Sequence, residues 1–488
     1  MIQTLRAAPR SKGSWGAGWA PLCGFAILLL NGCAVGPKYV RPAAEVPSSY
    51  KETGDLKPAQ PSDAIAKGKW WEVYQDQQLN ALEEQINVSN QTLKAAQDQF
   101  LQARAAVRVS RSALFPTVTG GLSITPTQNS SHRPFSTGAT RGSYTDIVLP
   151  VDVSYEADVW GRVRRTVEAS RSEAQASAAD LANVSLTLHA ELALDYFQLR
   201  GLDAQEQLLN STVDAFGKAL DLTQTRYKGG IASALDVAQA QTQLETTRAL
   251  AADIEVQRAA LEHAIAVLSG RPASTFNIQP LPLSAPPPPV PSGLPSDLLE
   301  RRPDIAAAER RAQEANAQIG VAKAAYFPLI TLTGTSGLES TAFGTLLQGP
   351  SAFGQLAAAA TETLFDAGRR HAISDQAKAA YDQSIANYRQ TVLSAFQDVE
   401  DNLAALRILE DEAKTEDVAV AAAERSLALS TNLYKGGLTS YLQVITAQNI
   451  ALSDERTAVD ILTRRMTASI LLVKAIGGGW DASQLPRI

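Results

Sequence analysis

The side chains that most often perform catalysis or bind metal ions are few and scattered in this sequence. The chain has four His and two Cys among its 488 residues. His132 lies in a polar stretch, whereas His189, His263 and His371 stand alone in helix-forming stretches. No serine triad, group of metal ligands or glycine-rich phosphate loop accompanies them. The sequence therefore predicts no enzyme, no metal site and no cofactor.

One cysteine lies where a covalent modification is expected. Cys33 ends the run Leu30-Asn31-Gly32-Cys33, which follows basic residues and an apolar segment. This order is typical of a secretory signal, and the run resembles a bacterial lipobox, although Asn31 is not the usual small residue. In that signal the Cys thiol is lipidated and becomes the new N-terminus. We expect a lipoprotein signal peptide over residues 1–32, with an ordinary secretory signal as the alternative; Ala34 favours the outer membrane.

Charge and hydropathy narrow the class of protein. The chain has 44 basic and 50 acidic residues. It lacks a basic patch with interleaved aromatic residues, so nucleic acid is not expected as a partner. No later segment offers about 18 uncharged apolar residues, so no transmembrane helix is expected. A body that crosses a membrane would therefore need strands closed into a barrel.

Two stretches predict very long helices. Arg369–Lys435 contains neither Gly nor Pro and is rich in strong helix formers. Its apolar residues recur at steps of three or four, as on the packing face of an amphipathic helix. At 1.5 Å per residue this helix would be about 100 Å long. A second one is expected over 162–226, and rods of this length must pack side by side or span a space.

The chain is two copies of one design. Tyr-Lys-Gly-Gly occurs at 227–230 and again at 434–437. Further matches hold the same order, with five extra residues between Pro116 and Gly161: Phe115-Pro116 with Phe327-Pro328, and Gly161-Arg162 with Gly368-Arg369. Such self-similarity indicates a repeat architecture.

Each copy is expected to fold in the same order. A first helix, about 77–113 or 303–325, stops at Phe-Pro because a residue before Pro leaves the helical region. Alternating strands follow, at 117–125 and 147–160 and again at 329–337 and 353–365, joined by polar loops at 126–142 and 339–351. The long helix then leads through the Gly-Gly turn into a shorter returning helix.

The strands have the pattern of an outer-membrane barrel. In the strand over 147–160, apolar residues share one face and Asp152, Glu156 and Asp158 share the other. Strands of about 10 residues with two unlike faces suit such a barrel, but the smallest barrel has about eight strands. The four strands of this chain must therefore close a barrel together with other chains, and the three acids are expected to line its lumen.

A proline-rich stretch over 281–297, with Pro at 286–289, separates the copies and predicts an extended connector. The expected domains are an extended segment over 33–70, a first repeat over 71–280 and a second over 298–488. Trp70-Trp71 is expected to pack onto the helices.

These landmarks together resemble the TolC-like outer-membrane factors, in their lipidated OprM- or NodT-like branch. They include Trp160-Gly161-Arg162, Leu299–Ile305, Ala475–Trp480 and the paired Phe-Pro and Tyr-Lys-Gly-Gly motifs. The resemblance covers the whole mature chain. It implies a mainly α protein with membrane β: a homotrimer whose twelve-stranded barrel, four strands from each chain, continues into a periplasmic helical barrel.

The resemblance also implies a function and partners. Such a protein is a passive exit duct in the outer membrane for drugs, toxic compounds or metals. It docks on a periplasmic adaptor and an inner-membrane pump, here expected to be of the resistance-nodulation-division type, and it contacts outer-membrane lipid. A structural protein of coiled helices without channel activity is the alternative.

The two Gly-Gly turns are expected to be docking tips. Gly supplies the left-handed helix cap, and a Ser starts the next helix. The resemblance adds that the tips meet the adaptor, with Ile231 and Leu438 as apolar contacts. The residues concerned are Gly229, Gly230, Ile231, Ser233, Gly436, Gly437, Leu438 and Ser440.

The resemblance also implies a periplasmic gate, lined by the returning helix after the second turn. Leu442 matches the apolar ring of the family, but Gln443 and Thr446 stand where relatives carry Asp. Closure is therefore expected to rest on Leu442 and polar contacts, without an acidic collar; an ordinary packing role for Leu442 is the alternative. Asp236 matches a position that in relatives bonds to the neighbouring tip. Tyr434 matches one of the bonding partners of that position.

The Cys33→Ser substitution tests the lipid anchor. It removes the thiol, so we expect complete loss of incorporated fatty acid, while the barrel still inserts into the membrane. The measurement is radiolabelled palmitate on protein isolated from growing cells, with Cys23→Ser as the control because Cys23 lies within the expected signal peptide. Label retained on the Cys33→Ser protein would refute the assignment.

Overall fold

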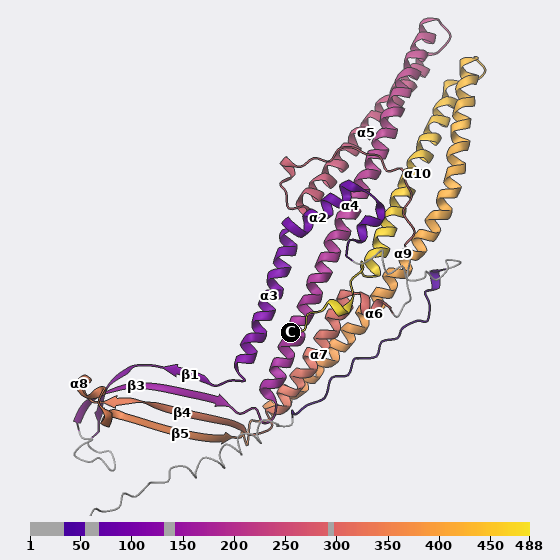
Figure 1. Ribbon diagram of the computed structural model, residues 1–488. Coiled ribbons are helices and arrows are strands. Elements are labelled where there is room, and N and C mark those ends of the chain that lie inside the picture. The colour runs from indigo at the N-terminus through magenta and orange to yellow at the C-terminus, as the bar shows by residue number, and fades with distance from the viewer. Residues whose placement is uncertain (1–33, 54–67, 131–141, 291–296) are drawn as a thin grey trace, which may run out of the picture. The chain divides into compact units, whose positions relative to one another are not determined.

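The computed structural model describes residues 34–53, 68–130, 142–290 and 297–488 (Figure 1). Cys33 and the expected signal peptide lie outside these residues, as does most of the expected first loop. Within the described ranges, no helix is both long enough and apolar enough to cross a membrane.

The order of elements confirms the duplication. The two long helices have 67 residues each, and the two returning helices have 35 each. The first copy comprises α2 (Gln77–Ser89), α3 (Gln91–Ser112), β1 (Thr117–Gly120), β2 (Ser123–Asn129), β3 (Gly142–Glu156), α4 (Arg162–Lys228) and α5 (Ala234–Leu268). The second comprises α6 (Leu298–Arg301), α7 (Pro303–Ala324), β4 (Leu329–Ser340), α8 (Phe343–Leu346), β5 (Ala352–Thr361), α9 (Arg369–Lys435) and α10 (Tyr441–Ala475).

The single helix predicted over 77–113 is wrong at one residue, Asn90, which separates α2 from α3. The backbone of Asn90 is extended. Its side-chain oxygen accepts a hydrogen bond from the N–H of Leu93, and its amide nitrogen donates to the carbonyl of Leu268, both at 2.8 Å. Asn is more favourable as a helix cap than inside a helix, because its side chain satisfies a backbone donor that the helix leaves free.

All the strands join one antiparallel sheet of order β1–β3–β4–β5, with β2 also paired to β3. β1 pairs with the end of β3, and β2 pairs with its start. β1 and β2 therefore occupy one strand position, and the chain contributes four positions. The first predicted strand is confirmed, but it is interrupted at Gly121-Leu122 and continues to Asn129, within the stretch predicted as loop.

Other strand boundaries also differ from the prediction. β3 ends at Glu156 instead of Trp160, because the carboxylate of Asp158 accepts hydrogen bonds from the N–H groups of Val163 and Arg164 at 2.9 Å and so caps α4. β4 runs on to Ser340, and the predicted loop after it contains the short helix α8. β5 ends at Thr361, short of the predicted end at 365.

The chain divides into two compact units. The first unit contains residues 103–174 and 311–384, which include the whole sheet, together with the chain before residue 42. The second contains residues 42–102, 175–310 and 385–488, which are helical apart from their connecting segments. The boundaries fall within α3, α4, α7 and α9, so each of these helices belongs partly to both units.

The main core of the second unit lies between α2, α4, α5 and α10. Trp70 and Trp71 are each only 3% exposed there, which confirms that they pack onto the helices. Trp71 stacks on His189, whose Nδ1 lies 2.6 Å from Oε2 of Glu83. Burial lowers the pKa of His189 to about 4 and raises the pKa of Glu83. Burial thus disfavours charge on both groups, and His189 is a core side chain.

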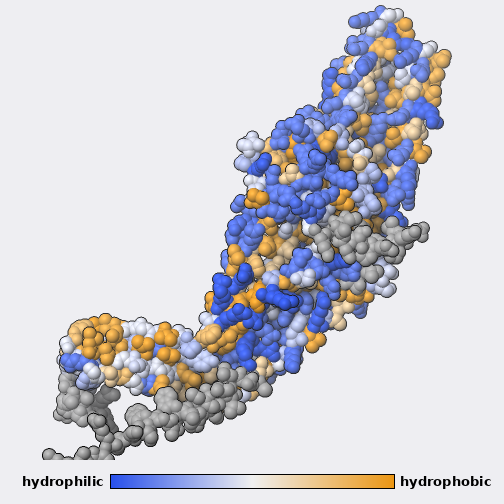
Figure 2. All heavy atoms as spheres, viewed as in Figure 1, coloured by the Kyte–Doolittle hydropathy of each residue, from blue (hydrophilic) through white to orange (hydrophobic). Residues whose placement is uncertain are grey.

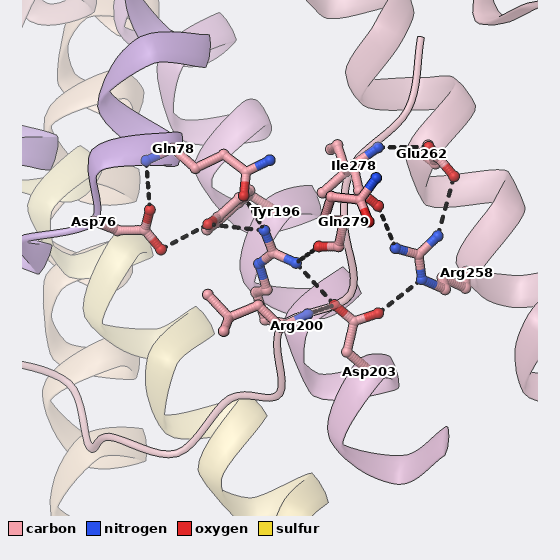
Figure 3. A network of polar contacts seen from close by, with 10 residues as sticks. Asp76, Gln78, Tyr196, Arg200, Asp203, Arg258, Glu262, Ile278 and Gln279 are labelled. Atoms are coloured by element: carbon pink, nitrogen blue, oxygen red, sulfur yellow. Dashed lines mark hydrogen bonds and ion pairs between the residues drawn. The ribbon is translucent and has the colours of Figure 1, made fainter. Parts of the chain in front are cut away.

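A buried network of polar side chains holds the start of the connector against the helices (Figure 3). Arg200 donates to Asp203 at 2.8 Å and to the carbonyl of Gln279 at 2.7 Å. Arg258 donates to the other oxygen of Asp203 and to the carbonyl of Ile278, both at 2.7 Å. Arg200 and Asp203 are each 2% exposed. Loss of one partner from such a buried pair costs about 3–5 kcal/mol, because the other charge is left uncompensated.

The described part of the connector, residues 281–290, is neither helix nor strand, which agrees with its proline content. Residues 276–290 form neither helix nor strand. The N–H of Leu281 donates to Asp203 at 2.8 Å, and the N–H of Leu283 donates to the carbonyl of Arg200 at 3.0 Å. The network therefore supplies backbone hydrogen bonds that this segment does not obtain from a sheet.

Candidate functional site

The sheet has one apolar and one polar face. Residues paired across antiparallel strands lie on the same face, and the face alternates along each strand. The apolar face carries Val118, Ile124, Leu149, Val151, Val153, Tyr155, Leu332, Leu338 and Leu356. The polar face carries Thr119, Thr125, Asp146, Asp152, Ser154, Glu156, Thr331, Thr333, Thr335, Glu339 and Gln355. The alternation read from the sequence is thus present in the sheet.

Most of the apolar face is uncovered within the described chain; Ile147, only 2% exposed, is an exception. Val118 is 63% exposed, Val151 49% and Leu356 87%, and Figure 2 shows hydrophobic residues gathered over the strands. In a water-soluble domain the apolar face of an antiparallel sheet packs on a core. This face therefore requires an apolar environment outside the chain.

Negative charge on the strands is confined to the polar face. The described strands carry four acidic residues and no Lys or Arg, and all four acids belong to the polar face: Asp146, Asp152, Glu156 and Glu339. Asp152 accepts a hydrogen bond from the hydroxyl of Thr335 at 2.6 Å, which links β3 to β4. Glu156 accepts from Nε of Arg162 at 2.8 Å, so its charge is partly neutralised.

The prediction that Asp158 shares this face is wrong. Asp158 lies beyond the end of β3, where its carboxylate caps α4 and accepts from Nε of Arg164 at 3.2 Å. The alternating pattern continued past the strand because a helix cap also requires a polar residue there. Sequence reasoning missed Asp146 and Glu339 instead, since both fall outside the predicted strands.

The two predicted tips have the same backbone geometry. Gly230 and Gly437 both have a φ of 73°, which Gly adopts without the steric penalty of a Cβ. The N–H groups of Ile231 and Leu438 donate back to carbonyls near the end of the preceding long helix at 2.8 and 2.9 Å, as in a glycine-terminated helix. Ile231 is 69% exposed and Leu438 78%. Each turn therefore presents an apolar side chain that its own chain leaves uncovered.

The returning helices begin differently in the two copies. Ser233 and Asp236 form a reciprocal capping box at the start of α5, with bonds of 3.2 and 2.9 Å. Ser440 stands at the equivalent start of α10, but its side chain makes no cap hydrogen bond. The expectation for the serines is thus right in position, and only Ser233 caps with its side chain. The carboxylate of Asp236 bonds to the backbone of Ser233 within its own turn.

A contact between the tips was not predicted from the sequence. The guanidinium of Arg226 lies 4.8 Å from the ring centre of Tyr434, and it donates to the carbonyl of Lys435 at 3.0 Å. Tyr434 is 6% exposed and its ring lies 5.1 Å from that of Tyr441, whose pKa burial raises to about 12. This cation–π contact joins α4 to α9. Its one signal in the sequence is the basic residue before the first Tyr-Lys-Gly-Gly, where the second copy has Leu433.

The residues expected at the gate are exposed. Leu442 is 53% exposed, and Gln443 and Thr446 are exposed beside it. The hydroxyl of Thr446 donates to the carbonyl of Leu442 within the same helix at 3.0 Å. Leu442 is therefore not part of the core of its own chain. No cluster of three or more His, Cys, Asp or Glu residues in the described ranges is placed to hold a metal ion.

The sequence matches the model of the outer membrane efflux protein family over residues 78–271 and 294–478, and the chain therefore belongs to that family. A toluene efflux pump outer membrane protein, TtgC of Pseudomonas putida, is 32% identical over 93% of this chain and 94% of its own length. The cation efflux system protein CusC of Escherichia coli is 29% identical over 94% of this chain and 98% of its own length.

Solved structures agree with the family. The outer-membrane channel OprN has a TM-score of 0.85 and 28% identity, and the match covers 92% of this chain and all of that one. The CmeC outer membrane channel of Campylobacter jejuni, with a TM-score of 0.87 and 23% identity over 93% of this chain and 96% of its own length, supports the fold alone. The resemblance to TolC-like factors and the fold class are thus confirmed. The protein is an outer-membrane efflux channel, and its family consists of channels rather than enzymes.

The Leu442→Ala substitution tests the gate. An apolar constriction limits ion flow by excluding water, so a smaller side chain should raise the single-channel conductance of the resting protein in planar bilayers. Ile450→Ala is the matched control, because Ile450 is 51% exposed on the same helix α10. Conductance equal to that of the unmodified channel, in a correctly assembled Leu442→Ala protein, would place the constriction elsewhere.

Proposed function

We propose that three copies of the chain close one twelve-stranded barrel in the outer membrane. Each chain supplies four strand positions, and among the described residues neither β5 nor the β1–β2 position has a strand on its outer side. An open sheet edge is not tolerated in hydrocarbon, because its N–H and C=O groups find no water to bond. The smallest barrel needs about eight strands, so one chain is not enough; the family resemblance favours three.

The two faces of the sheet set the orientation of the barrel. The apolar face contacts lipid, and the polar face lines a water-filled lumen. The observation that carries the proposal is the segregation of every strand carboxylate onto the polar face, opposite an exposed aliphatic face. The described strands bring acids and no bases to this lumen, which concentrates cations there, so the pore is cation-preferring.

The helices form the periplasmic part of the duct. Helices of 67 residues extend about 100 Å, enough to bridge much of the periplasm. The exposed tips at Ile231 and Leu438 dock on a periplasmic adaptor, and the inner-membrane pump is of the resistance-nodulation-division type. That outer-membrane components of efflux pumps work with adaptors and inner-membrane pumps supports this part of the proposal. The gate is formed around Leu442 by the following residues: Gln443, Thr446, Asp236 and Tyr434.

The cargo and the anchor complete the proposal. Relatives are named for the efflux of toluene, antibiotics and cations, which supports a duct for drugs, toxic compounds or metals that the pump selects. A lipid on Cys33 anchors the mature chain. Its parts are an extended segment over 33–70 and repeats over 71–280 and 298–488, which the connector over 281–297 joins.

Reversal potentials in planar bilayers test the duct and its charge preference. In a salt gradient the unmodified protein should conduct with a potential of the sign expected for cations, and Asp146→Asn with Asp152→Asn should shift that potential towards zero. Asp158→Asn is the control, since Asn still caps a helix and residue 158 lies off the polar face. A protein that assembles but does not conduct would be a structural helical protein, and anion preference would refute the acidic lumen.

The Leu438→Asp substitution tests the docking tips. A charge in an apolar contact must be desolvated without a partner, so dye export by cells that contain the adaptor and pump should be abolished. Leu438→Met keeps an apolar side chain and should export normally. Size-exclusion chromatography checks that both variants keep the unmodified oligomeric state. Normal export by the Leu438→Asp protein would mean that docking occurs elsewhere.

A further inference from the structure

Three basic residues lie at the end of the sheet where the strands meet the helices. We call Arg111, Lys323 and Arg369 the cationic belt. Arg111 lies near the end of α3, just before β1, and Lys323 near the end of α7, just before β4. Arg369 is the first residue of α9, after β5. The strand register, with Thr117 opposite Ser154 and Leu329 opposite Thr361, puts these strand ends at the same end of the sheet (Figure 1).

The charges of the belt are not neutralised within the described chain. Lys323 and Arg369 are exposed and Arg111 is half-buried, and none of the ion pairs among the described residues involves them. The duplication shows how one of these charges became free. Arg162 is the residue of the first copy that is equivalent to Arg369, and it pairs with Glu156. The residue that matches Glu156 in the second copy is Thr363, which has no carboxylate to offer.

An aromatic residue stands between each of these cations and its strand. Phe115 follows Arg111, Phe327 follows Lys323, and Phe365 precedes Arg369, always at the same spacing. Phe115 is 68% exposed and Phe365 87%, while Phe327 is 38% exposed and stacks on Trp160. Aromatic residues at the headgroup level, with Lys and Arg just beyond, are the usual anchors of a membrane-spanning segment.

We propose that the cationic belt binds the headgroup phosphates of anionic phospholipids in the membrane leaflet next to the helices. The inference rests on the proposed function, because it places the strands in the membrane, and it deepens that function by naming the lipid class. Charge complementarity argues for this ligand: the described strands carry acids only, whereas the belt carries three cations, unpaired among the described residues, beside exposed aromatic rings. Clusters of Lys and Arg next to a membrane span attract anionic lipids in this way.

The test is a lipid titration of the full-length oligomer in detergent, followed by its thermal unfolding temperature. We expect phosphatidylglycerol to reach half its stabilising effect at a concentration at least fivefold lower than phosphatidylethanolamine does, because the ammonium of the latter offsets its phosphate. Arg111→Gln with Lys323→Gln and Arg369→Gln should remove this preference. Arg171→Gln with Lys378→Gln and Lys218→Gln is the control, since it removes the same charge from exposed helix positions away from the sheet.

Each outcome decides the inference. A preference that persists in the belt variant, or that is lost equally in the control, overturns it, and so does an equal stabilisation by inorganic phosphate, which would indicate a site for small anions. If the triple variant does not assemble, Arg369→Gln alone should weaken the preference and Arg369→Lys should restore it; an unchanged preference in Arg369→Gln overturns the inference as well. Bilayer conductance separates the two proposals: a conducting unmodified protein without lipid preference refutes only the belt, whereas a non-conducting one refutes the duct.

Discussion

Backbone hydrogen bonding at the edges of the sheet is the constraint on which the rest of this protein depends. The chain folds four strand positions in order, but among its described residues the outer sides of β5 and of the β1–β2 position have no strand partner. Most of its apolar face is also uncovered among these residues, with Leu356 87% exposed. In hydrocarbon every N–H and C=O group must be paired within protein. A membrane sheet of this kind is therefore stable only as part of a closed assembly, and closure in turn gives the polar face its water-filled interior.

Duplication supplies the architecture, and single residues then make the two copies unequal. The long and returning helices have identical lengths in both copies, so the scaffold repeats almost without change. The chemistry at equivalent positions does not repeat. Arg226 reaches across to Tyr434, whereas the second copy has Leu433 at the position of Arg226. Glu156 neutralises Arg162, whereas the matching Arg369, with Thr363 in place of the acid, has no ion-pair partner among the described residues. Repetition thus provides the long helices and the strands, and substitutions at equivalent positions decide which charged side chains are left without an ion-pair partner among the described residues.

The second unit shows how a chain without a central sheet obtains a unique arrangement. Small and aliphatic side chains pack along the helices, but such surfaces alone permit sliding between neighbours. Polar groups that must be satisfied remove this freedom. Asn90 bonds both to α3 and to the end of α5, and the pair of Arg200 and Asp203 holds the connector through its backbone. A buried charge without its partner is costly, so these contacts favour one register of the helices and one path of the connector. A fixed path suits a duct whose wall must keep its shape.

The sequence by itself determined the elements that depend on local pattern. The absence of Gly and Pro over Arg369–Lys435 gave the correct bounds of α9, strict alternation gave the two faces of β3, and the matched motifs gave the duplication and the family. What tertiary structure alone decided are contacts between residues far apart in the chain. The break at Asn90 depends on a carbonyl of α5, and the burial of Tyr434 depends on a cation from the other copy. Periodicity reports which side of an element is apolar, because burial repeats with the element. It does not report which distant polar group will accept a hydrogen bond from a given donor, because that pairing has no periodic pattern in the local sequence.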